Sequence, residues 1–416
     1  MSEVRALLLT DVVDSTRLSE QLGDEAMARV WAAHDRVARD LLPLWRGREI
    51  DKTDGMLLLF EAAADAVGYA LAYHRALGSL EVPLKARAGL HVGPVILREN
   101  SAADVARGAK PLEVEGLAKP TTARVMALAR GGRLTGTVDI DAQAVLQLSG
   151  HTHTLSGLTL SGTGLLEVAG SFASSSSVVA EDALVLPGDL LVSGGTLTTQ
   201  GATNITGALR MAGGTLVANG TLTAATYSQT DNEAILDGTG TVNVSGAATW
   251  TDGSMFGAGT INFNAGLAIT GPADKNLAGG RVINLFGTST WSGATGANNN
   301  DFYTGPATIN NFGTFIDTNA FDTILRDWYS GDAMVFNNTG TYRKTAASVT
   351  TFAHTLRNQG LFEVDAGTLR LAGSTTHATG SRMRVANGAL LELQGSQAFQ
   401  DGVTLTGPAR LLGSAS

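Results

Sequence analysis

Asp11 and Asp54 are the two carboxylates whose sequence context best suits a catalytic or metal-binding role. Asp11 follows the apolar run 7–9 and a threonine, a pattern that predicts a short buried strand ending on the carboxylate. Asp54 lies just before the apolar run 56–60, in a polar segment that predicts the turn of a β-hairpin. If these strands are neighbours in one sheet, the two carboxylates lie side by side and repel unless a cation lies between them. Hard divalent cations prefer oxygen ligands, so the pair predicts a metal site.

The elements that must position these carboxylates follow from apolar spacing and from helix stop signals. Their order, strand, helices, hairpin, helix, strand pair, helix, predicts an α+β sandwich with helices over a mixed sheet. The expected segments are one or two helices in 17–45, a helix over 61–80, strands over 85–91 and 95–98 joined through Gly93-Pro94, and a helix over 120–130.

Taken in order, these segments resemble the catalytic domain of class III adenylate/guanylate cyclases over roughly residues 5–135. The resemblance implies a ferredoxin-like α+β fold for the first part of the chain. It is carried by Asp11-Val12-Val13-Asp14-Ser15-Thr16, the hairpin Ile50-Asp51-Lys52-Thr53-Asp54-Gly55, Gly89-Leu90-His91-Val92-Gly93-Pro94-Val95, Leu112-Glu113-Val114-Glu115-Gly116 and Thr121-Thr122-Ala123-Arg124-Val125.

The resemblance also implies an activity, namely conversion of a nucleoside triphosphate to the 3′,5′-cyclic nucleotide and pyrophosphate. Two Mg²⁺ or Mn²⁺ ions per site would lower the pKa of the attacking hydroxyl and hold the polyphosphate. By this resemblance Asp11 and Asp54 bind the metals with help from the carbonyl of Val12, and Arg124 stabilises charge on the α-phosphate. The family builds its site from two protomers, which implies a homodimer through the N-terminal domain.

The nucleotide-binding positions match the family only in part. The resemblance assigns substrate contacts to Lys52, Glu113, Gly55 and Lys119. Lys119 stands beside Pro120, which replaces the family's asparagine and has neither a side-chain donor nor a backbone N–H. Ile50 occupies the usual place of the base-selecting lysine, with Lys52 two residues on, and the family has Asp or Cys where this chain has Glu113. A carboxylate there favours the exocyclic amine of adenine, so ATP is the expected substrate over GTP, and whether catalysis survives these departures stays open.

The pattern changes at Gly131-Gly132-Arg133 and stays changed to the end of the chain. Short Thr/Val/Leu alternations are interrupted by glycine and asparagine at intervals that suit the coils of a solenoid. We therefore expect two domains, a cyclase-like domain over 1–133 and a right-handed parallel β-helix over 134–416. The recurring glycines are Gly195, Gly214, Gly240, Gly259, Gly287, Gly313, Gly340, Gly367 and Gly388.

In this β-helix, Gly and Asn should occupy tight left-handed turns, and asparagines at equivalent turns should form amide ladders between coils. Apolar side chains should stack inward. Phe286, Phe312 and Phe336 hold similar places relative to the glycines and should lie in or beside one internal stack. The region resembles the passenger repeats of bacterial autotransporter and adhesin proteins, which implies a surface or extracellular stalk whose partner the sequence does not identify.

Composition excludes several classes of function. A net charge of −9 argues against nucleic acid as a partner, and the absence of cysteine excludes disulfides and thiol catalysis. The start of the chain has no signal-peptide pattern, and no segment is apolar enough for a membrane span, which predicts a cytoplasmic protein. The repeat region favours the cell surface instead. Two functions therefore stay open: a nucleotide cyclase used in signal transduction, and a structural or adhesive surface protein with a degenerate, non-catalytic cyclase-like domain.

Overall fold

The computed structural model describes residues 2–52, 55–128, 133–149, 152–170, 176–293, 300–328 and 334–412. The chain forms two compact units, Met1–Gly188 and Asp189–Ser416. The first unit contains an α+β part and the first strands of the repeat region. The α+β part consists of β1 (Ser2–Val12), α1 (Ser15–Leu22), α2 (Asp24–Leu41), β2 (Arg48–Lys52), β3 (Met56–Phe60), α3 (Ala63–Gly78), β4 (Ala86–Glu99), α4 (Ala102–Ala106), β5 (Leu112–Glu115) and α5 (Ala118–Leu128).

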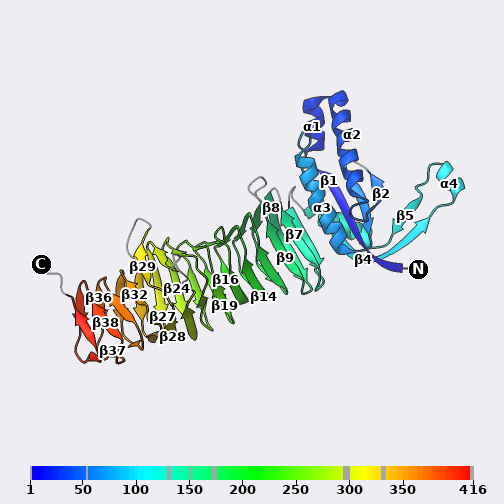
Figure 1. Cartoon of the computed structure of the whole chain (residues 1–416). Helices are drawn as coiled ribbons and strands as arrows, with labels where there is room; N and C mark the ends of the chain where they lie inside the picture. Colours follow the sequence, from blue (N-terminus) through cyan, green and yellow to red (C-terminus); the bar gives the residue numbers. More distant parts are fainter. Residues whose placement is uncertain are drawn as a thin grey trace. The chain divides into compact units, whose positions relative to one another are not determined.

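The α+β part has the ferredoxin-like connectivity that the resemblance implies, with a five-stranded sheet in the order β2-β3-β1-β4-β5. Figure 1 shows this part in blue and cyan, at the N-terminus of the chain. The expectation of a mixed sheet is wrong, because every pairing in this sheet is antiparallel. Helices connect β1 to β2 and β3 to β4, and the two strands of each pair run in the same direction. A strand from the other pair lies between the members of each pair, however, so neighbouring strands run in opposite directions.

The expected strand pair around Gly93-Pro94 is instead one strand, β4, which pairs with β1 along nearly its whole length, from Ser2↔Ile96 to Val12↔Ala86. Proline cannot donate to a sheet ladder and is tolerated where one side of the strand is open. At Pro94 that side is open, because β5 pairs with β4 only from Ile96 onward.

Side chains of β1 alternate between two apolar layers. Leu8 is buried on the face covered by α3. The same helix contacts β3, whose residues are all buried. Leu7 packs on the opposite face in a cluster with Val95, Leu112 and Ala118. On α2, His34 is fully buried, and its Nε2 lies 2.6 Å from the hydroxyl of Tyr73, so it packs α2 against α3.

The repeat region begins within the first unit, as parallel strands. There β6 pairs with β8, β8 pairs with β10, and β7 pairs with β9. The strands are β6 (Arg133–Asp139), β7 (Val145–Ser149), β8 (Thr152–Ser161), β9 (Leu165–Ala169), β10 (Ser177–Ala180) and β11 (Leu184–Leu186).

The second unit is a parallel β-helix in which strands recur on three faces, each strand pairing with its equivalent one coil away. The first face holds β13 (Thr196–Thr199), β15 (Thr215–Ala218), β17 (Ile235–Asp237), β20 (Ser254–Met255), β23 (Lys275–Leu277), β26 (Phe302–Thr304), β29 (Thr323–Asp327), β32 (Val349–Phe352), β35 (Thr368–Leu371), β38 (Leu390–Leu393) and β41 (Ala409–Leu411).

Two long strands, β14 (Thr203–Met211) and β16 (Thr221–Gln229), contribute to both of the other two faces. Of β14, the short strand β12 (Asp189–Val192) pairs with the second half only. One face continues through β18 (Thr241–Val244), β21 (Thr260–Phe263), β24 (Arg281–Leu285), β27 (Ala307–Asn311), β30 (Val335–Asn338), β33 (Thr355–Asn358), β36 (Thr375–His377) and β39 (Gln397–Phe399). The other continues through β19 (Ala248–Trp250), β22 (Ala268–Ile269), β25 (Thr288–Trp291), β28 (Thr314–Asp317), β31 (Thr341–Lys344), β34 (Leu361–Val364), β37 (Arg382–Val385) and β40 (Thr404–Thr406).

Aromatic side chains fill the interior of this β-helix, but not all those that the sequence predicts. Phe336 is buried and packs edge-on against Tyr342. Phe286 and Phe312 are 37% and 47% exposed and stack on each other outside, with ring centroids 5.0 Å apart. The expectation of an internal position is wrong for these two, because each follows an inward-facing strand residue and strand side chains alternate between faces.

Asparagine ladders connect successive coils as expected, but they run along strands and not at the turns where they were expected. In one ladder each side-chain amide donates to the side-chain oxygen of the preceding coil at 2.7–2.8 Å, through Asn243, Asn262, Asn284, Asn310 and Asn337. A second, buried ladder joins Asn311, Asn338 and Asn358.

Recurring glycines serve two different needs. Gly287 adopts the left-handed conformation (φ 50°), as expected for the tight turns. At Gly313 a Cβ atom would instead lie 2.0 Å from the carbonyl oxygen of Gly287 in the preceding coil, so close backbone approach excludes a side chain there.

Candidate active site

The hairpin between β2 and β3 begins its return strand directly beside the end of β1. The backbone N–H of Met56 donates to Thr10 Oγ1 at 2.9 Å. A Cβ on Gly55 would lie 1.8 Å from the carbonyl oxygen of Thr10, so only glycine allows this approach. Asp54, the second predicted metal ligand, lies outside the described residues. Gly55, the first described residue after it, packs against the backbone of Thr10 and Asp11.

Asp11 faces an open hollow of about 450 Å³ that is also lined by Val12 and by the start of α1. The carboxylate is 18% exposed and is paired with Arg87 of β4, its direct partner in the β1–β4 register. Both Nε, at 2.9 Å, and Nη2 of Arg87 donate to Asp11 Oδ2. A cation that binds Asp11 through this oxygen must therefore compete with the guanidinium.

The donors at this hollow have the oxygen chemistry that Mg²⁺ prefers. Asp14 and Glu20 line it together with Asp11. Asp14 occupies the N-cap position of α1 in a left-handed conformation but forms no side-chain cap. Within the described ranges, no three His, Asp or Glu side chains are grouped to hold a metal. Asp11 with the Val12 carbonyl thus fits as part of a metal site that needs Asp54 to complete it.

Two of the predicted substrate-binding residues, Glu113 and Lys119, line a second hollow of about 340 Å³. Glu113 is paired with Arg98 of β4. In the same hollow Lys110 pairs with Asp51, and this hydrogen bond lowers the pKa of the Asp51 carboxyl. The hollow therefore contains both carboxylates and ammonium groups, which suits hydrogen bonding to a polar heterocycle.

The two hollows share no lining residue. Asp11 and Glu113 lie near opposite ends of β4, beside Arg87 and Arg98. The second hollow nevertheless reaches Asp51 of β2, which pairs with Leu57 beside Leu9 of β1.

Lys52, the predicted base reader, lines neither hollow and instead donates to Asp35 of α2 at 2.9 Å. Burial opposes ionisation of Asp35, but hydrogen bonds from His34 and Lys52 lower its pKa overall. Arg124 belongs to α5, and its side chain is outside the described atoms. Pro120 lies in the first turn of α5, where a missing N–H removes no helix hydrogen bond.

The sequence analysis did not identify Arg87 as a partner of Asp11 or Arg98 as a partner of Glu113. Neither arginine belongs to a recognisable motif, and each becomes relevant only through the register of β4 with β1 or β5. The register Asp11↔Arg87 could have been derived once β1 and β4 were taken as one antiparallel pair along their full length.

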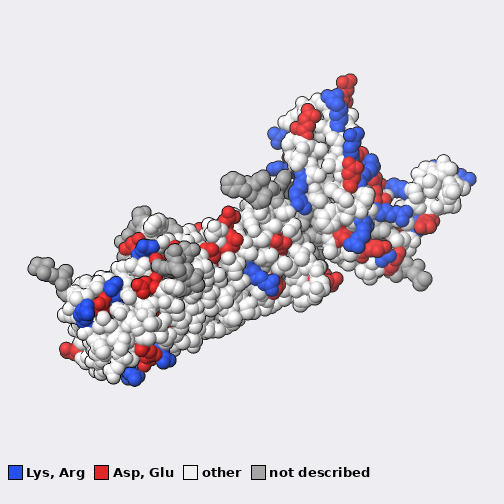
Figure 2. All heavy atoms as spheres, viewed as in Figure 1, with Lys and Arg blue, Asp and Glu red and all other residues white. Residues whose placement is uncertain are grey.

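Charged side chains are distributed differently over the two parts of the chain. Figure 2 shows positive and negative side chains intermingled over the α+β part, while the visible face of the coils in the second unit is mostly uncharged. Of the helices that the structure describes, none is both long and apolar enough to cross a bilayer.

Comparison with known proteins gives structural neighbours but no sequence relatives. The chain matches no protein-family model and no curated protein. Similar solved structures include the guanylyl cyclase Cya2, at 22% identity over 32% of this chain and 73% of that one, with a TM-score of 0.29. The adenylyl cyclase CyaB from P. aeruginosa is 16% identical over 32% and 76%, with a TM-score of 0.28. An adenylate cyclase from Trypanosoma brucei is 19% identical over 31% and 69%, also at 0.28.

Proposed function

We propose that the α+β part is a nucleotide cyclase that converts ATP, in preference to GTP, to the 3′,5′-cyclic nucleotide and pyrophosphate. The observation that carries this proposal is the position of Asp11. It is the last residue but one of β1, it lies beside Gly55, and it faces a hollow large enough for a polyphosphate. The motifs from Asp11 to Arg124 follow the order found in class III cyclases, which supports a metal-binding role for Asp11.

In this proposal Asp11 and Asp54, with the Val12 carbonyl, hold two Mg²⁺ or Mn²⁺ ions. When bound, the metals would supply Lewis acidity toward the hydroxyl and the phosphates. Arg124 donates to the α-phosphate as negative charge develops there. Glu113 accepts a hydrogen bond from the exocyclic amine of the base, and Lys119 contributes a donor where the family has asparagine.

The active unit is a homodimer in this proposal. The resemblance to class III cyclases supports a site in which a second copy brings Glu113, Lys119 and Arg124 to the metal carboxylates of the first. This arrangement explains why one protomer places the groups in two separate hollows. Because the site exists only in the dimer, specific activity should fall on dilution.

A second function is favoured by the ion pairs that occupy two predicted site residues, Asp11 with Arg87 and Lys52 with Asp35. If these pairs persist with nucleotide present, the α+β part is a non-catalytic module attached to a structural or adhesive β-helix. The partner of the β-helix and its compartment, cytoplasm or cell surface, belong to the same open question.

The test is an assay of the purified chain with ATP or GTP and with Mg²⁺ or Mn²⁺, measuring cyclic nucleotide formed. We expect turnover in the parent and none in Asp11→Asn. Asp14→Asn is the matched control, because Asp14 lines the same hollow but is not a proposed ligand. Absence of turnover with every nucleotide and metal combination would favour the non-catalytic module.

A further inference from the structure

The register between β1 and β3 stops just before the residues nearest the candidate metal site. Its last pair is Leu9↔Leu57, so the ladder does not reach Thr10 and Met56. A side chain continues the contact instead, because the backbone N–H of Met56 donates to Thr10 Oγ1 at 2.9 Å. Thr10 is 2% exposed and directly precedes Asp11. The hydroxyl of Thr10 therefore links the strand that carries Asp11 to the return strand of the hairpin.

Tyr73 of α3 and His34 of α2 extend this link into a buried chain of hydrogen bonds. Thr10 hydrogen-bonds the hydroxyl of Tyr73, and that hydroxyl lies 2.6 Å from His34 Nε2. His34 Nδ1 lies 3.0 Å from Asp35 Oδ1. His34 and Tyr73 are fully buried, so water does not compete for the contact between them. These side chains join α2 and α3 to the end of β1.

The donors and acceptors of this chain have one consistent direction. Burial lowers the pKa of His34, which leaves the imidazole neutral near pH 7. Burial opposes ionisation of Asp35, but its hydrogen bonds lower its pKa overall, so it is a carboxylate that can only accept. Nδ1 of His34 therefore carries the proton, and Nε2 accepts from the hydroxyl of Tyr73. Tyr73 in turn accepts from Thr10, whose oxygen accepts from Met56.

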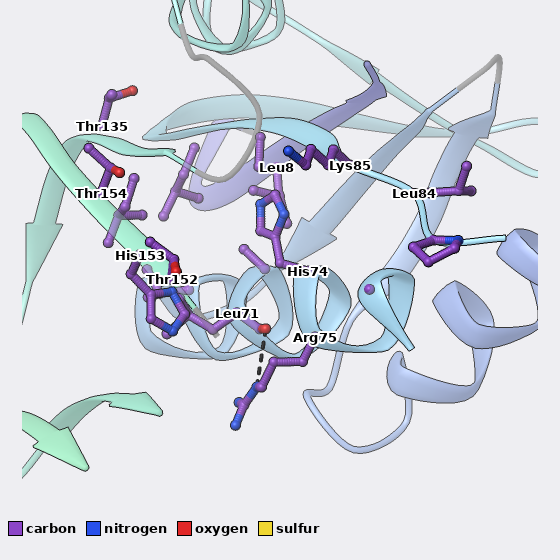
Figure 3. Close-up of a pocket in the computed structure, with 17 residues that line it drawn as sticks. Leu8, Leu71, His74, Arg75, Leu84, Lys85, Thr135, Thr152, His153 and Thr154 are labelled. Atoms are coloured by element: carbon purple, nitrogen blue, oxygen red, sulfur yellow. Dashed lines mark hydrogen bonds between the residues drawn. The ribbon is translucent and has the colours of Figure 1, made fainter. Parts of the chain in front are cut away.

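Packing also holds α3 beside this end of β1. His74 follows Tyr73 on α3, and it lines a cavity of about 450 Å³ together with Leu8 of β1 (Figure 3). Thr135 of β6 and Thr154 of β8 line the same cavity, so α3 also lies beside the first strands of the repeat region. Because these contacts position the helix, removing one hydroxyl from Tyr73 should interrupt the hydrogen-bond chain and leave α3 in place.

We propose that His34 and Tyr73 are positioning residues for the metal site: through Thr10 they hold the strand end that carries Asp11 against the start of β3. This role rests on the proposed function, because the position of Asp11 matters in this way only if Asp11 binds a metal. Residues behind the ligands of a metal set the ligand positions and thereby its affinity. Neither His34 nor Tyr73 lines the hollow at Asp11, so both act without touching the metal.

Titration of the whole chain with Mn²⁺, followed by its electron paramagnetic resonance signal, tests the proposal without requiring turnover. Tyr73→Phe should weaken Mn²⁺ binding about three- to tenfold, the equivalent of one lost hydrogen bond. Tyr69→Phe is the matched control. Tyr69 is equally buried on α3, but its hydroxyl donates to the Ala38 carbonyl oxygen of α2 at 3.0 Å and not to Thr10. Both variants should lower the melting temperature to a similar extent, and Tyr69→Phe should bind Mn²⁺ like the parent.

Thr10 provides a second comparison. Thr10→Ser keeps the hydroxyl and should retain the Mn²⁺ affinity, whereas Thr10→Val keeps the shape of the side chain and should weaken binding about tenfold. If Thr10→Val does not fold, the two tyrosine variants still decide the question. Equal Mn²⁺ binding by Tyr73→Phe and Tyr69→Phe, with a parent that binds Mn²⁺ through Asp11, overturns the positioning role alone. A parent that binds no Mn²⁺, or binds it no better than Asp11→Asn, overturns the metal role of Asp11 and the positioning role with it.

Discussion

Replacing Arg87 should strengthen metal binding at Asp11. Arg87 donates to Asp11 through two nitrogens, and a metal that uses the same oxygen must break both contacts. Charge-assisted hydrogen bonds contribute about 1.5–3 kcal/mol when shielded from water. Because Arg87 is 38% exposed, we discount this contribution to about 1.4 kcal/mol, which corresponds to tenfold in a binding constant.

We therefore expect Arg87→Gln to lower the dissociation constant for Mn²⁺ about tenfold. The half-saturating metal concentration for cyclic nucleotide formation should fall in parallel. Direct titration with Mn²⁺, by calorimetry or by its electron paramagnetic resonance signal, measures binding without requiring turnover. Arg87→Gln also removes a surface pair from β4, so the melting temperature must be measured alongside.

Two variants serve as controls. Arg384→Gln removes an arginine that pairs with Glu363 in the β-helix, and should leave Mn²⁺ binding unchanged. Asp11→Asn should eliminate the site in either background. Unchanged or weaker Mn²⁺ binding in folded Arg87→Gln would refute the view that Arg87 competes with the metal for Asp11.

Three further predictions concern stability, each measured by urea unfolding. Asn310→Ala interrupts the amide ladder on both sides and should cost about 1–2 kcal/mol, whereas Asn264→Ala, at an exposed position, should cost little; equal losses would contradict a stabilising ladder. Asp317→Asn should cost about 3–5 kcal/mol, because it leaves the fully buried ammonium of Lys344 without its counter-charge. Its control is Asp365→Asn, whose exposed pair with Arg343 should contribute less than about 1 kcal/mol, and similar losses for the two variants would reject the buried pair as the cause. The pKa of His74 is about 4 in the folded chain against 6.5 ordinarily, so its contribution is complete above pH 6.5 and is lost as the pH falls toward 4. The free energy of unfolding should therefore decline by the order of 2 kcal/mol more in the parent than in His74→Gln over that range, and identical pH profiles would refute the shift.

The sequence predicts the secondary structure of the α+β part because its apolar spacing is strongly periodic. Strand β3 and the helices α2 and α3 lie within the expected ranges. The continuity of β4 through Gly93-Pro94 was not predictable from local signals, which favour a turn. It depends on pairing with β1 and on an open side at Pro94, and both are properties of the whole sheet.

The repeat spacing predicts the β-helix for a similar reason, since each coil must place a turn at nearly the same interval. It does not determine which face each side chain occupies. Phe286 and Phe312 follow an inward-facing residue and therefore point outward, a distinction of one residue that glycine spacing does not resolve.

The sequence predicts the position of a site residue only where that position depends on a single strand. Asp11 lies one residue before the end of β1, close to the expected strand end, but its partner Arg87 lies 76 residues later in the chain, on β4. The roles of Asp54, Arg124, Lys52, Glu113, Gly55 and Lys119 remain predictions, since they depend on nucleotide, metal and a second copy of the chain.

The most direct test of a cyclase site shared between two protomers is complementation between inactive variants. Asp11→Asn removes a metal carboxylate and Arg124→Ala removes the phosphate-binding arginine, so each protein alone should be inactive. In an equimolar mixture about half of the dimers pair one of each, and each such dimer contains one intact site of two. The mixture should therefore recover about one quarter of the parent's cyclic nucleotide production. No recovery in a mixture whose heterodimers are demonstrated, with an active parent, would contradict the shared site.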